Sequence, residues 1–121
     1  MKLKPGILVK EFKMFYGGRI IACLSEDNKM KLLHRTGKRG YSFTNVLKSE
    51  SFDLYGIRGW RVKSLEAKPW KEHLLLGLCS QWEIYIIRAD VLLSNSGQEI
   101  EQVTNVRVIK KMYYKNPASK R

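Results

Sequence analysis

Two carboxylates and a lysine near the middle of the chain are of the types that cleave phosphodiester bonds with the help of a metal ion. Asp53 is followed thirteen residues later by Glu66, and Lys68 comes two positions after Glu66. Residues two apart on a β-strand share a face, so Glu66 and Lys68 would lie side by side, within reach of Asp53 on a neighbouring strand. Carboxylates placed in this way can hold a divalent cation.

This spacing resembles the motif of the PD-(D/E)xK nucleases. The resemblance implies a nuclease in which Asp53 and Glu66 hold Mg²⁺ as the cofactor and Lys68 positions or activates water, so that these three are the catalytic residues. The sequence nonetheless departs from that motif. No proline precedes Asp53, and Glu11-Phe12-Lys13 is a second E-x-K triplet with no aspartate before it. Pro69 directly after Lys68 would also end the strand that the motif needs. The nuclease is therefore an alternative hypothesis. The favoured hypothesis is a protein without catalytic activity, whose carboxylates here are surface groups paired with cations.

The cysteines and histidines do not form a recognisable metal or catalytic set. Cys23 and Cys79 each lie in an apolar run and are expected to be buried hydrophobic residues. His34 and His73 stand alone, and the four residues together lack the spacing of zinc ligands. We therefore expect no cofactor and no metal, Mg²⁺ in the nuclease alternative excepted.

The charge balance indicates the kind of partner. The 121 residues include 23 Lys and Arg against 11 Asp and Glu, a net charge of +12. A nucleic acid, DNA or RNA, would neutralise this excess, since cations that contact phosphates release condensed counterions. An acidic protein is the alternative partner, which would make the chain an inhibitor or regulator. No apolar run spans a bilayer and no signal peptide is evident, so we expect no membrane partner and a cytoplasmic location, in the nucleoid or nucleus if it binds chromosomal DNA.

Three basic segments are candidate binding sites for phosphates. The first is a glycine-containing loop with a tyrosine for base contact. The second is residues 58–63, in which Arg58 lies between two glycines and residues 60–63 alternate as a strand. The third is the C-terminal segment, where basic residues alternate with tyrosines that could stack on bases. The predicted nucleic-acid-binding residues are Arg35, Lys38, Arg39 and Tyr41 in the first segment, Arg58, Arg61 and Lys63 in the second, and Lys110, Lys111, Tyr113, Tyr114 and Lys115 in the third.

Alternation along the second segment separates a tryptophan from two of its cations. Arg61 and Lys63 fall on one face of the strand, and Trp60 and Val62 on the other. We expect Trp60 to lie in the core and the cations to form the binding face. An exposed Trp60 would instead be a platform on which a base could stack.

The elements that position these residues are mostly short strands between turn signals. Residues 7–35 predict a three-stranded meander, because turn residues at 17–18 and 25–28 separate runs of alternating hydrophobicity. Residues 45–49 fit either a short helix capped by Thr44 or a strand. Residues 70–79, which follow Pro69, predict a short helix, with a buried strand as the alternative. Residues 60–63, 82–93 and 103–109 predict further strands.

These elements together predict a β-rich α+β fold. We expect six or seven short strands in a small curled antiparallel sheet or barrel, with one or two short helices. A single compact domain would span residues 1–109, followed by a basic, partly flexible tail over residues 110–121. Small barrels often present a groove to nucleic acids, and the lack of a base-reading helix favours recognition of shape and backbone. An accessory subunit of a nucleoprotein complex fits this pattern, and edge strands could pair in a homodimer.

Overall fold

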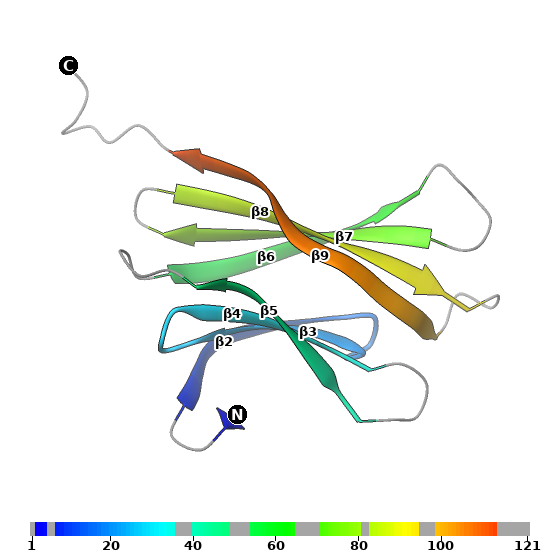
Figure 1. The fold of residues 1–121 in the computed structure, drawn as a ribbon, viewed down its shortest axis with the longest axis horizontal. Helices are drawn as coiled ribbons and strands as arrows, with labels where there is room; N and C mark the ends of the chain where they lie inside the picture. The colour runs from blue at the N-terminus through cyan, green and yellow to red at the C-terminus, as the bar shows by residue number, and fades with distance from the viewer. Residues whose placement is uncertain are drawn as a thin grey trace.

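The protein folds as two antiparallel β-sheets (Figure 1). The computed structural model describes residues 2–4, 7–35, 40–48, 54–64, 71–80, 83–94 and 99–113, which form strands and no helix. None of these residues therefore belongs to a helix that could cross a membrane. The first sheet contains, in spatial order, β1 (Lys2–Lys4), β2 (Ile7–Phe15), β3 (Ile20–Ser25), β4 (Lys29–His34) and β5 (Ser42–Lys48). The second contains β6 (Leu54–Lys63), β7 (Lys71–Ser80), β8 (Glu83–Leu93) and β9 (Ile100–Tyr113).

The two sheets enclose one hydrophobic core. Each sheet is an open meander in which neighbouring strands follow one another in sequence, and β1 adds only three residues at one edge. Strand β2 contacts β6, and β5 contacts β9, so the sheets meet along both edges. Buried residues of both sheets belong to a single cluster, among them Leu24, Leu32, Leu76 and Ile87. The side of each sheet that faces this cluster is called its inner face below, and the opposite side its outer face.

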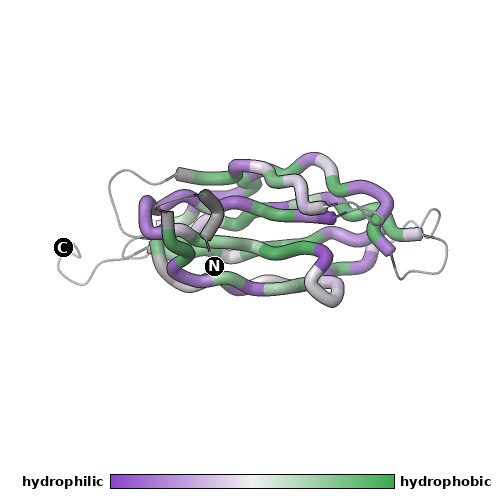
Figure 2. Tube along the Cα trace, turned by 90° about the horizontal axis from the view of Figure 1, so that it is seen from below, coloured by the Kyte–Doolittle hydropathy of each residue, from purple (hydrophilic) through white to green (hydrophobic). Residues whose placement is uncertain are grey.

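Period-two burial is clearest in β7 and β8. Every second residue of both strands is buried, and the residues between them are partly exposed. Leu74, Leu76 and Leu78 of β7 thus face the core, whereas His73 and Leu75 face outward. Figure 2 shows hydrophobic and hydrophilic residues alternating along the strands. Which side chains lie on the outer faces is therefore determined by the burial of their neighbours in sequence.

Side chains of β2 satisfy backbone groups of β6 along one meeting edge. The Glu11 carboxylate accepts hydrogen bonds from the backbone N–H groups of Gly56 (3.1 Å) and Ile57 (3.4 Å). The Lys10 ammonium donates to the Leu54 carbonyl oxygen at 2.8 Å. These bonds pair groups that a strand at the edge of a sheet would otherwise leave open. They join the two sheets without merging them into a continuous barrel.

The favoured helix over residues 70–79 is wrong, because residues 71–80 form β7. Of the two alternatives for residues 45–49, the strand is the one observed, since residues 42–48 form β5. The described residues form two open sheets and not one curled sheet or barrel. Strand β7 pairs with β6 and β8 on its two sides, and a central strand with partly buried faces has a nearly continuous apolar run that resembles a helix in sequence. The meander over residues 7–35 is confirmed as β2, β3 and β4, and strands occur at 60–63, 83–93 and 103–109 as predicted. The described residues thus contain nine strands, with eight long ones in two four-stranded open sheets.

The final strand is longer than predicted. Residues 110–113, which the sequence assigned to a tail, are the last four residues of β9. Residues from 114 onward lie outside the described residues.

Replacement of Gly59 by alanine tests the packing between the sheets. A Cβ at Gly59 would lie 2.3 Å from Phe15 Cζ and 2.9 Å from Leu76 Cδ2. Because Leu76 is fully buried and Phe15 packs against the core, Gly59→Ala should lower the free energy of unfolding by about 1–3 kcal/mol in urea denaturation. Gly40→Ala is the matched control, since its Cβ would meet nothing within 4 Å. Equal stability of the two variants would contradict the packing described here.

Candidate nucleic-acid interface

The outer face of the second sheet gathers basic side chains around one tryptophan. The strand register aligns Trp60, Leu75, Arg88 and Arg107 in one row across β6 to β9. An adjacent row contains Arg58, Gly77, Ile86 and Lys110, and a third, on the other side of the first, contains Val62, His73, Asp90 and Thr104. We call these three rows, together with Lys71, the basic face.

The basic face has a strong excess of cations. Its basic residues are Arg58, Lys71, Arg88, Arg107 and Lys110. Asp90 is the one acidic residue among the positions that define this face. Arg58, Arg107 and Lys110 are exposed, and none of the three has an ion-pair partner among the described residues. Such an arrangement suits a polyanion, because the cations remain available to phosphates.

Trp60 lies on this face and not in the core, so the prediction of a buried Trp60 is wrong. Its side chain is 53% exposed, and its six-membered ring rests on Gly77, where a Cβ would lie 3.5 Å from Cζ3. Gly59 faces inward in its place, because the inner position is filled by the Phe15 ring from β2. The strand thus alternates as predicted, but Trp60 and Val62 lie on the outer face of the sheet, and Arg61 and Lys63 lie on its other side.

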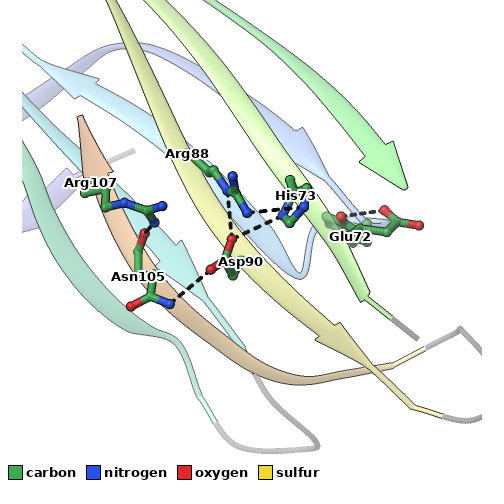
Figure 3. A network of polar contacts seen from close by, with 7 residues as sticks. Glu72, His73, Arg88, Asp90, Asn105 and Arg107 are labelled. Atoms are coloured by element: carbon green, nitrogen blue, oxygen red, sulfur yellow. Dashed lines mark hydrogen bonds and ion pairs between the residues drawn. The ribbon is translucent and has the colours of Figure 1, made fainter. Parts of the chain in front are cut away.

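A network of polar contacts holds Arg88 in place (Figure 3). Arg88 Nε donates to Asp90 Oδ1 at 3.0 Å, and Arg88 Nη2 lies 3.2 Å from His73 Nε2. A guanidinium can only donate, so His73 Nε2 is the acceptor and the ring proton is on Nδ1. His73 Nδ1 then donates to Asp90 Oδ1 at 3.2 Å. The Nε2 atom of His73 is thus already engaged by Arg88.

The network extends to β9 and orients a second arginine. Asn105 Nδ2 donates to Asp90 Oδ2 at 3.0 Å, and Arg107 Nη1 donates to the Asn105 carbonyl oxygen at 2.6 Å. Asn105 has a φ of 53° at an irregularity of the β8–β9 pairing. Burial would raise the pKa of Asp90, but hydrogen bonds from Asn105 and Arg88 outweigh it and hold that pKa below its usual value. Asp90 therefore stays ionised and anchors Arg88.

A polar hollow of about 320 Å³ adjoins the network. It is lined by groups that can donate and accept hydrogen bonds, including Ser64, Lys71, His73, Gln102, Thr104 and Asn105. It lies toward one end of β7, β8 and β9, beside the row that contains Trp60 and Arg88.

Two of the predicted binding residues, Arg61 and Lys63, point away from the basic face. Arg61 Nε and Nη2 donate to the two carboxylate oxygens of Glu72 at 2.8 and 2.9 Å, and the guanidinium lies 4.1 Å from the centre of the Tyr16 ring. Tyr16 also donates to Glu72 Oε1 at 2.7 Å. Burial, and then this hydrogen bond, raises the pKa of Tyr16 well above its ordinary value. Arg61 thus neutralises a buried carboxylate, and Lys63 lies exposed on the same side of β6.

The C-terminal segment is likewise divided between the two faces. Lys110 pairs across from Ile86 on the basic face, whereas Lys111 and Tyr113 take inner-face positions opposite Tyr85 and Glu83. Lys111 Nζ lies 2.9 Å from Glu83 Oε2 and stacks over the rings of Tyr85 and Tyr113. Lys111 is therefore committed to a buried carboxylate.

Arg35 and Tyr41 flank strands of the first sheet, since Arg35 directly follows β4 and Tyr41 directly precedes β5. The Arg35 guanidinium lies 5.5 Å from the centre of the Tyr41 ring, and the Tyr41 hydroxyl donates to the Gly18 carbonyl oxygen at 2.6 Å. The outer face of this sheet also exposes Phe43, over which Lys31 stacks at 4.9 Å. Each of these two rings thus already has a cation of the protein itself near one face.

The remaining predicted residues lie outside the described part of the chain. They are Lys38, Arg39, Tyr114 and Lys115 of the basic segments, and Asp53, Glu66 and Lys68 of the nuclease alternative. Among the described residues, no group of three or more His, Cys, Asp and Glu side chains could hold a metal ion. Cys23 and Cys79 are thiols on the outer faces of different sheets.

Sequence reasoning missed Arg88, Lys71 and the exposed position of Trp60. The alternation of residues 83–93 does place Arg88 opposite to the buried Ile87, so an outward Arg88 was readable. What the sequence does not contain is the register that aligns Arg88 with Trp60.

Comparison of the chain with protein-family models, curated proteins and solved structures found no match. A function must therefore be inferred from the residues of the basic face themselves.

Lowering the pH should reveal how much the Glu72 carboxylate contributes to the stability of the folded protein. The hydrogen bond from Arg61, assisted by that from Tyr16, holds the pKa of Glu72 below its ordinary value of 4.5. The unfolded chain therefore binds a proton at higher pH than the folded one, and stability is lost as pH falls below about 4.5. Glu72→Gln should be less stable than the wild type at pH 7, with the difference narrowing toward pH 2 in urea denaturation series.

Glu26→Gln is the control for this series, because the Glu26 carboxylate is exposed and makes no ion pair to a described residue. Its stability should follow the wild type across the pH range. If the free energies of unfolding of wild type and Glu72→Gln differ by the same amount at all pH values, the lost carboxylate charge is not the cause of the lower stability.

Proposed function

We propose that this protein binds nucleic acid without catalysis, through the basic face of its second sheet. The observation that carries the proposal is the set of five cations on one face, at positions that include a single carboxylate, around an exposed tryptophan. Phosphate contacts by lysine and arginine supply affinity that does not depend on sequence.

The cations lie at both edges of the sheet. Arg58 is on β6, whereas Arg107 and Lys110 are on β9, three strand spacings away. At about 4.8 Å per spacing, the two groups are about 14 Å apart across the sheet. A phosphate backbone that crosses the strands would therefore meet a cation at each edge and Arg88 between them.

Cations elsewhere in the described structure support this division of roles. Arg61 and Lys111 neutralise Glu72 and Glu83, both almost fully buried, and these pairs belong to the fold. Arg58, Arg107 and Lys110 on the basic face are exposed and make no ion pair with a described residue. A polyanion can therefore bind there without breaking an interaction that stabilises the protein.

Removal of three of the exposed cations should weaken binding to any sequence. Arg58→Gln, Arg107→Gln and Lys110→Gln in one variant should lower the affinity for an oligonucleotide by about tenfold or more at moderate salt. The slope of log affinity against log salt should fall by roughly 2 to 3, because each lost phosphate contact contributes about 0.7 to 0.9. Fluorescence anisotropy with a labelled oligonucleotide over a salt series measures both quantities.

A triple variant on the first sheet provides the matched control. Lys13→Gln, Lys29→Gln and Lys31→Gln removes the same charge from β2 and β4. Its affinity and salt slope should stay close to those of the wild type. Equal losses in the two triple variants would mean that net charge alone, and not the basic face, controls binding.

Replacement of Asp90 should tighten binding. Asp90→Asn removes the negative charge from the basic face while keeping a side chain that can accept hydrogen bonds from Arg88. A unit charge about 7 Å from a phosphate contributes about 0.6 kcal/mol in water, so the affinity should rise by roughly threefold. The same anisotropy titration measures it, and a weaker affinity with unchanged stability would contradict the proposed face.

A further inference from the structure

We propose that the ligand of the basic face is a single-stranded nucleic acid with one of its bases stacked on Trp60. This inference rests on the function proposed above and adds the form of nucleic acid that the site selects.

The Trp60 ring is built as a platform with one open side. It rests on Gly77, whose lack of a side chain lets the ring lie against β7, and it remains 53% exposed. No cation of the described residues stacks on it, in contrast to Tyr41, Phe43 and Tyr16. An exposed aromatic ring of this kind can accept a planar group from solvent.

A stacked base must come from a single strand. In a duplex both faces of each internal base are covered by its neighbours, so only an unpaired, unstacked base can present a face to a side chain. Stacking of this kind tolerates any base, which agrees with cations that contact only phosphates.

The surroundings of Trp60 suit the two groups that flank a stacked base. Arg58 lies two residues away on β6, about 7 Å along the strand, and Arg88 lies two strands away, about 10 Å across the sheet. Both are within reach of phosphates on either side of that base. The polar hollow adjoins the next row, so the neighbouring nucleotide falls beside Gln102 and Thr104, which can donate and accept hydrogen bonds.

An apolar protein segment is a poorer occupant. The apolar neighbours of Trp60 on the basic face are only Val62 of its own strand and Leu75 of β7, which is partly buried. Arg58 on β6 and Arg88 on β8 lie just beyond them. The excess of positive charge complements phosphates spaced along a chain.

The test compares single strands with a duplex of the same length. Fluorescence anisotropy titrations of the wild-type chain would use 12-nucleotide oligo(dT), 12-nucleotide oligo(U) and a blunt 12-base-pair DNA. We expect at least one single strand to bind more tightly than the duplex. Trp60→Ala should weaken that single strand by fivefold or more, in line with the energy of one base–aromatic stack, and should leave duplex binding unchanged.

Two further variants separate stacking from structural damage. Trp60→Phe should keep most of the affinity, because it retains an aromatic ring, and Val62→Ala removes exposed apolar surface from the same strand and should have little effect. Oligo(dT) should also quench tryptophan emission of the wild type more than that of Trp60→Phe, which retains Trp70 and Trp82.

The outcomes distinguish this inference from the proposed function. If duplex and single strands bind equally and Trp60→Ala changes neither, stacking is overturned while nucleic-acid binding through the cations stands. If neither form binds at low salt, the proposed function fails, and this inference fails with it.

Discussion

The mutual burial of one face of each sheet is the constraint on which the rest of the structure depends. Two antiparallel sheets can bury their apolar residues only by facing each other, and strands have a period of two. The leucines of β7 and the buried residues of β8 therefore force every other residue of both strands outward. The cations and Trp60 lie together on the second sheet because their neighbours in sequence fill the core.

The same constraint separates the cations that pair with buried carboxylates from those that lie on the outer face. Inward positions near the ends of the strands include Glu72 and Glu83, which are buried, and each has a basic partner, Arg61 and Lys111 respectively. A buried carboxylate without a partner would destabilise the folded state, so Arg61 and Lys111 are needed for folding stability. At outward positions of this sheet, Arg58, Arg107 and Lys110 make no ion pair with a described residue and are available to an external anion.

The sequence predicted local features better than the way the sheets face each other. The meander of β2, β3 and β4 was predictable because its turns contain residues with specific backbone preferences, such as Asn28 with a φ of 60°. The alternation around Trp60 was also predictable, but alternation alone does not say which set is buried. That choice depends on Phe15 of β2, which packs over Gly59 and comes from a distant part of the chain. Strand β7 was mistaken for a helix because its neighbours on both sides were not visible in its own sequence.

The candidate site shows the same limit. Arg58 and Lys110 were predicted from local basic composition. Arg88 is recognised as part of the candidate site only from the register that aligns the strands. The irregularity at Asn105, which brings Arg107 into the Asp90 network, has no clear signal in the sequence.

The most direct test of this account is to map the binding surface by NMR. Amide and indole chemical shifts of isotope-labelled protein would be followed during titration with a short oligonucleotide. The account predicts that perturbations concentrate on the outward residues of β6 to β9, with the Trp60 indole N–H among them. Perturbations confined to the first sheet, or centred on Arg61 and Lys63, would contradict it.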